Sequence, residues 1–576
     1  MIINFSPGLI MMIGGLLLPL LPRSTRILAV LLLPLLTAYA AWNIPEGTDI
    51  VSHFAGLLLH PVYYHPYSLI FATVFCIAAF IGGVFALKTV SRPLELSAAY
   101  LYAGSAVSAV YSGDLVSLFI FWEIMAVGST AVVLCGATSG ARQAAFRYAI
   151  MHFFGGVLLL AGIAAYITYA KDIMITPLSF NFANLYDLMS GDLGTIAKLL
   201  MLLGILINAG APPLGAWLPD AYPESSPTGG GFLSAFTTKT SVFVLLTLFP
   251  GSDILLWIGL IMVFYGIIMG AITNDLRGML SYSIINQVGF MVAGIGIGTE
   301  MALLGAAAHA FCHIIYKCAL FMSAGSVIQA TGIRKTTELG GLYHTMKITA
   351  FCGFIGAISI SAFPFTSGFI SKALYVEGAI EANMAMVWLL LLAGSVGVAA
   401  LTGCKYMWFV FFQEDSGLRP KEAPLNMKLA MLLVSALCIL PGFMPQAVYM
   451  LLPVGIDYNP NTTDHIINQI ELLLGGCVAF FVLLALQKRT DTIVLDFDWL
   501  WRKFAGGLIM LSEQLIYFTA GAAAKAAKIV LGKAKDKIYE VSGPNAAISR
   551  NWALGTTVLV SVLMLGILLV IYYIGK

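Results

Sequence analysis

Seven ionisable side chains lie inside, or at the edge of, stretches otherwise apolar enough for lipid: Glu123, Arg147, Lys239, His309, His313, Lys317 and Lys372. A charge inside a bilayer costs about 3 kcal/mol on a lenient scale, so it is usually retained for moving protons or ions. His309, His313 and Lys317 recur every four residues, which would align them in one stripe along a helix. Histidine titrates near neutral pH and a desolvated lysine releases its proton readily, so the stripe favours a proton relay.

Each of these residues also has a less specific interpretation. Histidines four apart can share a zinc ion, but no third ligand is evident beside His309 and His313, and a charged Lys317 would repel the cation. Lys372 could extend its long side chain to the membrane surface, and Glu123 could simply bridge helices. We expect proton transfer rather than a metal site, and no cluster of oxygen ligands suited to a hard cation stands out.

The composition predicts the class of protein. The chain has 576 residues, of which 60% are hydrophobic and 10% charged, with a mean hydropathy of +0.92. Soluble proteins carry about a quarter of their residues as charged ones, so this is a polytopic membrane protein. A net charge of +2 gives no indication of nucleic-acid binding. The eight cysteines form no CxxC pair, and we expect buried thiols rather than disulfides or metal ligands.

Apolar runs of about twenty residues predict sixteen transmembrane helices. They fall near 7–22, 24–44, 66–88, 95–112, 114–136, 143–170, 196–222, 231–250, 253–273, 278–298, 301–329, 346–380, 384–413, 426–446, 465–487 and 551–574. The N-terminus lacks the basic region of a cleavable signal, so we expect the first span to be retained.

The loops that follow odd-numbered spans carry most of the loop lysines and arginines: Arg23, Arg26, Lys88, Arg92, Arg142, Arg147, Arg277, Arg334, Lys335, Arg419, Lys421, Lys488 and Arg489. By the positive-inside rule these loops are cytoplasmic, which places both termini outside a bacterial-type inner (plasma) membrane. Arg147 and His152 would then lie near the cytoplasmic end of the sixth span, where they fit interfacial anchors as well as functional groups.

The segment 488–550 departs from this pattern. It carries Lys525, Lys528, Lys533, Lys535 and Lys537 at its end, and a further span through 505–524 would bring these lysines outside. We therefore predict an amphipathic helix lying along the cytoplasmic surface, anchored by the final span. A flexible basic linker is the alternative.

Two predicted spans are interrupted by proline. Pro212 and Pro213 interrupt the seventh span, and Pro364 interrupts the twelfth. Such a break is tolerated at membrane depth only against protein or a water-filled cavity, and breaks at matching places in two halves indicate a transport site. The two interrupted spans are five spans apart, which implies a repeat of five helices. Because five is odd, the second copy is inverted in the membrane. The predicted segments are 1–94 (helices one to three), 95–250 (first repeat), 251–415 (second repeat), 416–487 (helices fourteen and fifteen), 488–550 (surface helix) and 551–576 (anchoring helix).

Several motifs occur in order over residues 95–415: Phe121-Trp122-Glu123, Trp217-Leu218-Pro219-Asp220-Ala221, Phe236-Thr237-Thr238-Lys239-Thr240, Asn274-Asp275-Leu276-Arg277 with Ser281-Tyr282-Ser283, the stripe followed by Leu320-Phe321, and Pro364 to Lys372. In these motifs the chain resembles the antiporter-like subunits shared by Mrp cation/proton antiporters, the membrane arm of respiratory complex I and membrane-bound hydrogenases. The closest resemblance is to an Mrp D-type subunit.

The resemblance implies a proton path through each half, joined at mid-membrane by lysines, histidines and water. Glu123, Lys239, the stripe and Lys372 match the family pattern. Asn208, however, stands where the family carries a lysine that pairs with the glutamate on helix five. Asparagine accepts and donates hydrogen bonds but carries no proton charge, and Lys198 lies almost three turns away. The first half is therefore expected to be altered, gated differently or inactive, unless Lys239 or Arg147 partners Glu123.

The expected function is that of a proton-translocating membrane subunit of a multi-subunit Na⁺/H⁺ antiporter. The expected relay residues are Glu123, Lys239, His309, His313, Lys317 and Lys372, and the expected partners are other membrane subunits, protons, Na⁺ and the bilayer. We expect a transporter subunit rather than an enzyme, and no cofactor, since the chain carries no flavin, haem or iron–sulfur motif. The alternatives are a proton-pumping subunit of a redox-driven complex, such as an NADH-quinone oxidoreductase or membrane-bound hydrogenase, and an energy-coupling subunit for uptake of another solute.

Overall fold

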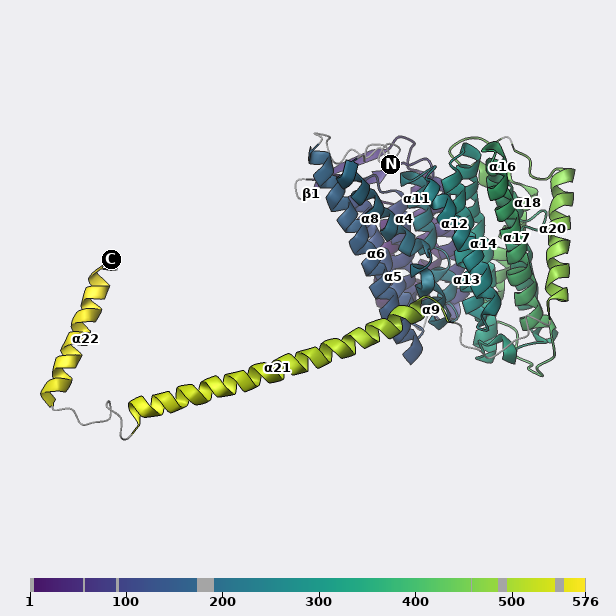
Figure 1. The fold of residues 1–576 in the computed structure, drawn as a ribbon. Helices are drawn as coiled ribbons and strands as arrows, with labels where there is room; N and C mark the ends of the chain where they lie inside the picture. The colour runs from purple at the N-terminus through teal and green to yellow at the C-terminus, as the bar shows by residue number, and fades with distance from the viewer. Residues whose placement is uncertain are drawn as a thin grey trace. The chain divides into compact units, whose positions relative to one another are not determined.

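The computed structural model describes residues 5–54, 57–89, 93–172, 191–456, 458–484, 495–543 and 554–574. The chain forms two compact units, Met1–Asp498 and Trp499–Lys576. In the first unit the helices run side by side as a bundle (Figure 1), and its largest hydrophobic core includes side chains from Met11 to Ile456.

The first half of the bundle contains α1 (Gly8–Leu17), α2 (Arg23–Trp42), α3 (Ser68–Ala86), α4 (Pro93–Val110), α5 (Leu115–Leu134), α6 (Ser139–Asp172), α8 (Gly191–Ala209), α9 (Trp217–Ala221), α10 (Gly229–Leu233) and α11 (Thr237–Leu248). The second half contains α12 (Asp253–Ile272), α13 (Leu276–Ile297), α14 (Glu300–Thr331), α15 (Lys347–Ile360), α16 (Ser367–Glu381), α17 (Ala385–Val398), the π-helices η8 (Ala399–Lys405) and η9 (Trp408–Phe412), α18 (Leu425–Phe443), α19 (Gln446–Tyr449) and α20 (Thr463–Val482). In Figure 1, α6 and α20 lie at opposite edges of the bundle.

Fourteen segments of the described chain are helical, long and apolar enough to cross a membrane, against sixteen predicted spans. Thirteen of them coincide with predicted spans, and the fourteenth, Met510–Val541, lies in the predicted surface helix. The predicted spans 7–22 and 346–380 contain only shorter apolar helices, because prolines interrupt both. The predicted span 95–112 is α4, which is 18 residues long and carries Glu95 and several serines. The polytopic helical class is confirmed, and fourteen segments of the described chain meet this measure of length and hydropathy against about sixteen predicted spans.

One small sheet was not predicted. Strands β1 (Asp49–Phe54) and β2 (Leu57–Tyr63) pair antiparallel, with Asp49 opposite Tyr63. The backbone N–H of His60 on β2 donates to Oδ2 of Asp114 at 2.7 Å, while Oδ1 of Asp114 accepts from the first N–H groups of α5. The hairpin therefore fixes the start of the helix that carries Glu123.

Three helices of the bundle are interrupted. The predicted breaks separate α8 from α9 and α15 from α16, and a third, which was not predicted, separates α10 from α11 at residues 234–236. Gly210, just after α8, has a φ of +84°, a conformation that glycine adopts without strain. Beyond it, Nε1 of Trp217 donates to the carbonyl of Ile207 at 2.8 Å, so a side chain after the break satisfies a carbonyl before it.

The second unit is formed by α21 (Asp498–Ser542) and α22 (Leu554–Ile574). The 45 residues of α21 form one uninterrupted helix, which makes it about 68 Å long at 1.5 Å per residue. This is about twice the 30 Å thickness of the hydrocarbon core, so α21 is too long for an ordinary span. Its position on the cytoplasmic surface stays a prediction.

Candidate functional site

The three stripe residues lie on α14 and are completely buried. Nδ1 of His309 is 3.0 Å from the hydroxyl of Ser371 on α16. The hydroxyl of Tyr316 is 3.4 Å from Nε2 of His309, on the other side of the ring. Neither ring nitrogen of His313 has a hydrogen-bond partner among the described residues. The stripe thus places two imidazoles, with ring centroids 6.2 Å apart, in the middle of the bundle.

Lys317 completes the stripe one turn further along α14. Its Nζ donates to the carbonyl of Leu280 at 3.1 Å and to the hydroxyl of Ser283, both on α13. The neighbouring polar side chains of α13 form a separate chain of hydrogen bonds, in which Tyr316 donates to Gln287 at 2.9 Å and Gln287 donates to Asn286. Gln287 therefore joins α13 to α14, and Asn286 joins α13 to α12 by donating to the carbonyl of Val263 at 2.8 Å.

Lys372 lies at the other end of the stripe, and the broken helix holds it there. Pro364 has no N–H, so the carbonyl of Ile360 four residues earlier loses its helical donor. Nζ of Lys372 donates to that carbonyl at 2.9 Å and to the hydroxyl of Ser395 on α17 at 3.2 Å. Lys372 interacts electrostatically with His309, whose Nδ1 contacts the neighbouring Ser371.

Lys239 is held in the same way at the third break. Its Nζ donates to the carbonyl of Ser234 at 2.6 Å, inside the interruption between α10 and α11. The side chain is completely buried and interacts electrostatically with His313 and Lys317. The structure thus brings Lys239 to the middle of the stripe.

Glu123 is not joined to this line by an ion pair in the described part of the chain. Glu123 lies on α5, and its carboxylate packs against Gly156 of α6. A Cβ atom added at Gly156 would lie 1.9 Å from Oε1 of Glu123. A Cβ atom added at the adjacent Gly155 would lie 3.4 Å from Oδ1 of Asn208. Asn208, on α8, therefore packs against the same stretch of α6 as Glu123. Oε1 of Glu123 and both polar atoms of Asn208 are buried without a hydrogen-bond partner among the described residues.

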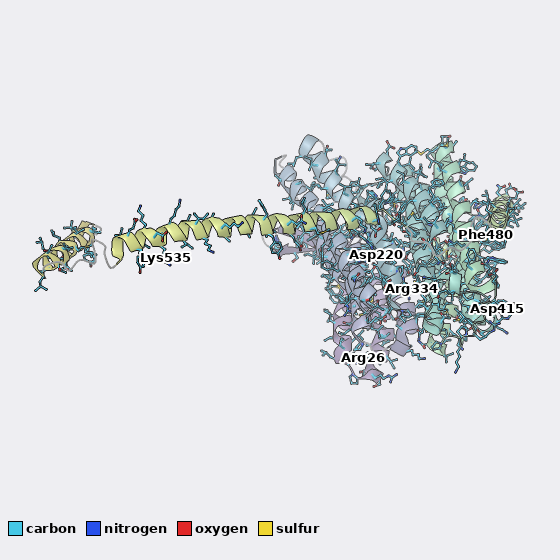
Figure 2. All side chains as sticks on the ribbon, turned by 60° about the horizontal axis from the view of Figure 1, so that its bottom comes forward. Arg26, Asp220, Arg334, Asp415, Phe480 and Lys535 are labelled. Carbon is cyan, nitrogen blue, oxygen red and sulfur yellow. The ribbon has the colours of Figure 1, made fainter. Side chains whose placement is uncertain are left out.

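Arg147 forms an ion pair with Asp220 and not with Glu123. Its Nε and Nη2 both donate to the carboxylate of Asp220 in α9 at 2.8 Å, which makes a bidentate ion pair. Asp220 is labelled in Figure 2. His152, one turn further along α6, is completely buried with its ring stacked on Tyr148 at 3.9 Å and edge-on to Trp217 at 4.4 Å. His152 therefore packs inside the bundle, and the interfacial interpretation of this residue is wrong.

Further ionic contacts fix the segment that follows α9. Arg334 donates to Glu224 and to Asp275 at 2.8 Å each. Nη1 of Arg277 donates to the carbonyls of Ser225 and Ser226 at 2.8 and 3.0 Å. Asp275 caps α13, so these contacts connect the broken helix α8–α9 of the first half to the start of the second half.

Sequence reasoning missed three ionisable residues. Nζ of Lys405 on η8 is buried and donates to the carbonyls of Gly270, Ala271 and Thr273, at the end of α12. Asp496 accepts from the hydroxyls of Tyr265 and Tyr282. Glu471 lines a cavity beside Lys372. The signal for Lys405 was the same as for the stripe, a charge inside an apolar run.

Comparisons with known proteins identify the family. Residues 112–398 match the family described as NADH:quinone oxidoreductase/Mrp antiporter, transmembrane. The D-type subunit of a Na⁺/H⁺ antiporter from Alkalihalophilus pseudofirmus is 30% identical over 405 residues, which cover 66% of this chain and 80% of that protein. The chain belongs to this family. The resemblance inferred from the motifs is thereby confirmed, and this member of the NADH:quinone oxidoreductase/Mrp antiporter family is a multi-pass membrane protein.

Two solved structures share the fold of this family member. A chain of the Mrp complex from Dietzia sp. DQ12-45-1b has a TM-score of 0.67 and 20% identity, covering 81% of this chain and 98% of that one. A chain of an archaeal respiratory membrane complex, the membrane-bound sulfane sulfur reductase, has a TM-score of 0.70 and 22% identity, covering 97% of this chain and 99% of that one. The second likeness covers nearly the whole chain.

Proposed function

We propose that this chain is a proton-translocating membrane subunit of a multi-subunit Na⁺/H⁺ antiporter of the Mrp type. The observation that carries the proposal is the line of buried titratable side chains formed by Lys239, Lys317, His313, His309 and Lys372, in which neighbouring members interact electrostatically. Buried amines and imidazoles at membrane depth are costly, and proton relays are among the few functions that retain them.

The geometry supports proton transfer along this line. His309 has Ser371 on one ring nitrogen and Tyr316 on the other, so its ring can take a proton at one nitrogen and release one at the other. Neither ring nitrogen of His313 is occupied by a hydrogen bond to the described residues, so both can accept or release a proton in the relay. Protonation at either end changes the energy of the next group by Coulomb repulsion, which is strong where water is excluded.

We further propose the finer features that the sequence predicts. These are two inverted repeats, a first half in which Glu123 and Asn208 form the site beside α6, both chain termini outside the plasma membrane, α21 on the cytoplasmic surface, and other membrane subunits as partners. The Alkalihalophilus relative, which is named as part of a Na⁺/H⁺ antiporter, supports sodium as the coupled ion.

A redox-driven complex is the second candidate. The likeness to a chain of a respiratory membrane complex over nearly the whole length favours it, because the same kind of chain can be driven by electron transfer in partner proteins. Affinity purification of the native complex distinguishes the two. Small antiporter subunits would support the first function, and quinone- or hydrogenase-type subunits the second.

Reconstitution of the complex in liposomes tests the relay. Lys372→Ala and His313→Ala should each abolish proton movement driven by a Na⁺ gradient. Lys421→Ala, at an exposed loop lysine, is the matched control and should be unaffected. Undiminished transport in both Lys372→Ala and His313→Ala would show that the line is not the relay.

A further inference from the structure

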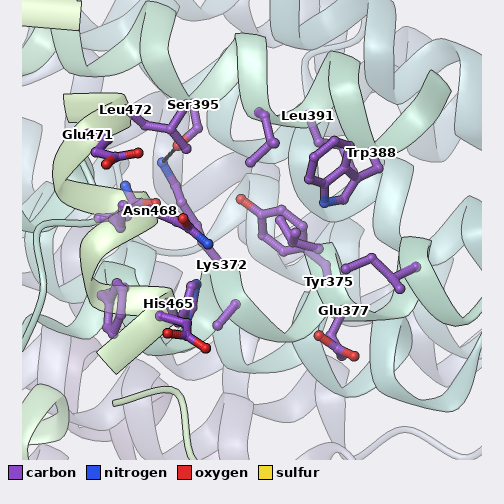
Figure 3. Close-up of a pocket in the computed structure, with 18 of the residues that line it drawn as sticks. Lys372, Tyr375, Glu377, Trp388, Leu391, Ser395, His465, Asn468, Glu471 and Leu472 are labelled. Atoms are coloured by element: carbon purple, nitrogen blue, oxygen red, sulfur yellow. Dashed lines mark hydrogen bonds between the residues drawn. The ribbon is translucent and has the colours of Figure 1, made fainter. Parts of the chain in front are cut away.

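A cavity of about 880 Å³ lies between α16, α17 and α20 and reaches from the end of the bundle to Lys372. Its lining includes Tyr458, Asn459 and Thr462 from the loop before α20. Lys372 and Ser395, which Figure 3 labels, line it as well. The cavity is large enough for several water molecules, each of which occupies about 30 Å³. It therefore offers the buried amine a route to the surface.

The face of α20 that lines this cavity is polar, although α20 has the length and hydropathy of a membrane span. His465, Asn468, Gln469 and Glu471 all line the cavity, and the lining continues at Leu472, Gly475 and Gly476 with helical spacing. Glu471 is the ninth of the twenty residues of α20, which places its carboxylate near the middle of the span. A carboxylate at that depth costs about 3 kcal/mol, so its retention calls for a function.

Two polar groups that line the cavity have hydrogen-bonding capacity that the described residues do not use. The hydroxyl of Tyr375 on α16 is buried, lines the cavity and has no hydrogen-bond partner among the described residues (Figure 3). An ammonium group has three N–H donors, and Nζ of Lys372 makes two hydrogen bonds in the described structure. Both groups fit a hydrogen-bonded water path that starts at the amine.

We propose that Glu471 is the residue that exchanges protons with Lys372, as the step between the buried relay and the surface. The ammonium of Lys372 gives a proton through water to the carboxylate of Glu471, leaving a neutral amine and a carboxylic acid. Glu471 then releases the same proton along the polar face of α20 towards Asp464 and His465, which restores its carboxylate. Lys372 takes a new proton from the histidine side of the relay, and both charges are then restored. This role rests on the proposed function, because it requires that Lys372 carries the proton.

The exchange requires that Lys372 and Glu471 face the same water-accessible space, and both residues line this cavity. The titratable groups facing the cavity or packed against this part of α20 are Lys372, Tyr375 and Glu377 on α16, Tyr458 in the loop, Asp464 and His465 on α20, and Cys404 on η8.

Glu471→Gln in the intact complex tests the proposal. It should lower Na⁺-driven proton movement by at least about tenfold, the effect of removing a positioned proton-transfer group, and flatten its dependence on pH. Glu471→Asp should restore part of the rate. Glu381→Gln, at the exposed end of α16 and outside the cavity lining, is the matched control and should behave as the unmodified complex.

Carbodiimide labelling supplies a readout that a structural role would not move. Dicyclohexylcarbodiimide reacts with protonated carboxyl groups in membranes, so peptide mass spectrometry should find the adduct on Glu471, and more of it at lower pH. Normal transport in Glu471→Gln together with lost transport in Lys372→Ala would overturn this inference and leave the proposed function standing. Loss of partner subunits from the Glu471→Gln complex would overturn it in favour of a structural contact. Normal transport in both variants would overturn the proposed function as well.

Discussion

Gly156 offers a test of whether the position of the Glu123 carboxylate controls proton movement. A Cβ at this glycine would lie 1.9 Å from Oε1 of Glu123 and 2.9 Å from its Cδ. Since real Cβ contacts are at least 3.0 Å, Gly156→Ala must displace Oε1 by about 1.1 Å or more. The displaced atom is the end of a flexible side chain, so the cost in folding free energy is that of a strained rotamer, about 0.5–1.5 kcal/mol.

We therefore expect Gly156→Ala to assemble normally and to transport poorly. A reacting group misplaced by about 1 Å typically loses about a hundredfold in rate. The assay is the Na⁺-driven pH change in liposomes that contain the assembled complex, with co-purification of the partner subunits as the measure of assembly. Gly155→Ala is the comparison variant, because its Cβ would contact Gly204, Ile207 and Asn208 at 3.2–3.4 Å and so shows what an added methyl group on α6 does beside Asn208 and not against Glu123.

A double variant decides whether the effect passes through Glu123. Gly156→Ala combined with Glu123→Gln should be no slower than Glu123→Gln alone, because both changes act on one carboxylate. Full activity of Gly156→Ala would refute the reasoning, since the carboxylate would then work from a displaced position. Additive losses in the double variant would refute it too, because the alanine would then act through helix packing.

Three further predictions concern the stability and geometry of the bundle. Lys405→Met should lower the melting temperature, because the carbonyls at the end of α12 lose a charged hydrogen-bond donor, which costs about 1.5–3 kcal/mol of stability. Lys405→Arg should restore part of that stability. Equal melting temperatures of the unmodified protein and both variants would contradict the contact. Diamide should join Cys404 to Cys477, whose Sγ atoms are 3.4 Å apart, and mass spectrometry should find the linked peptides except in Cys404→Ser; no link would mean that η8 and α20 are further apart. Arg277→Met should cost about 1–3 kcal/mol of stability by leaving the carbonyl of Ser225 unsatisfied, measurable by thermal unfolding, whereas an unchanged transition would exclude a net contribution.

The stripe was the most predictable part of the candidate site. His309, His313 and Lys317 share one helix, so their spacing alone placed them on one face. Their neighbours on other helices could not be derived in this way. That Ser371 contacts His309, or that Lys239 lies near His313, depends on which helices pack together, and local periodicity carries no information on that.

Local signals also decided which breaks were predicted. The interruptions at Pro212 and Pro364 follow from missing N–H donors. The break between α10 and α11 contains no proline, and nothing in Ser234-Ala235-Phe236 marks it, so a continuous span was expected. Glu471 was overlooked for a related reason. It stands six residues into the predicted span 465–487, where a carboxylate fits the membrane surface, but α20 begins earlier and its polar face turns to a cavity.

The three breaks follow one rule, which explains why the lysines lie where they do. Each interruption leaves a carbonyl without its helical donor, and a side chain from beyond the break donates to it: Trp217 to Ile207, Lys239 to Ser234 and Lys372 to Ile360. The single N–H of an indole is occupied by this hydrogen bond, whereas an ammonium that donates one hydrogen bond to the carbonyl has two further N–H groups. A lysine at such a break is thus held in place by one bond and can still transfer a proton through another. On this argument the broken helices position the amines, and the first break, with Trp217 as donor and Asn208 beside it, has no amine to position.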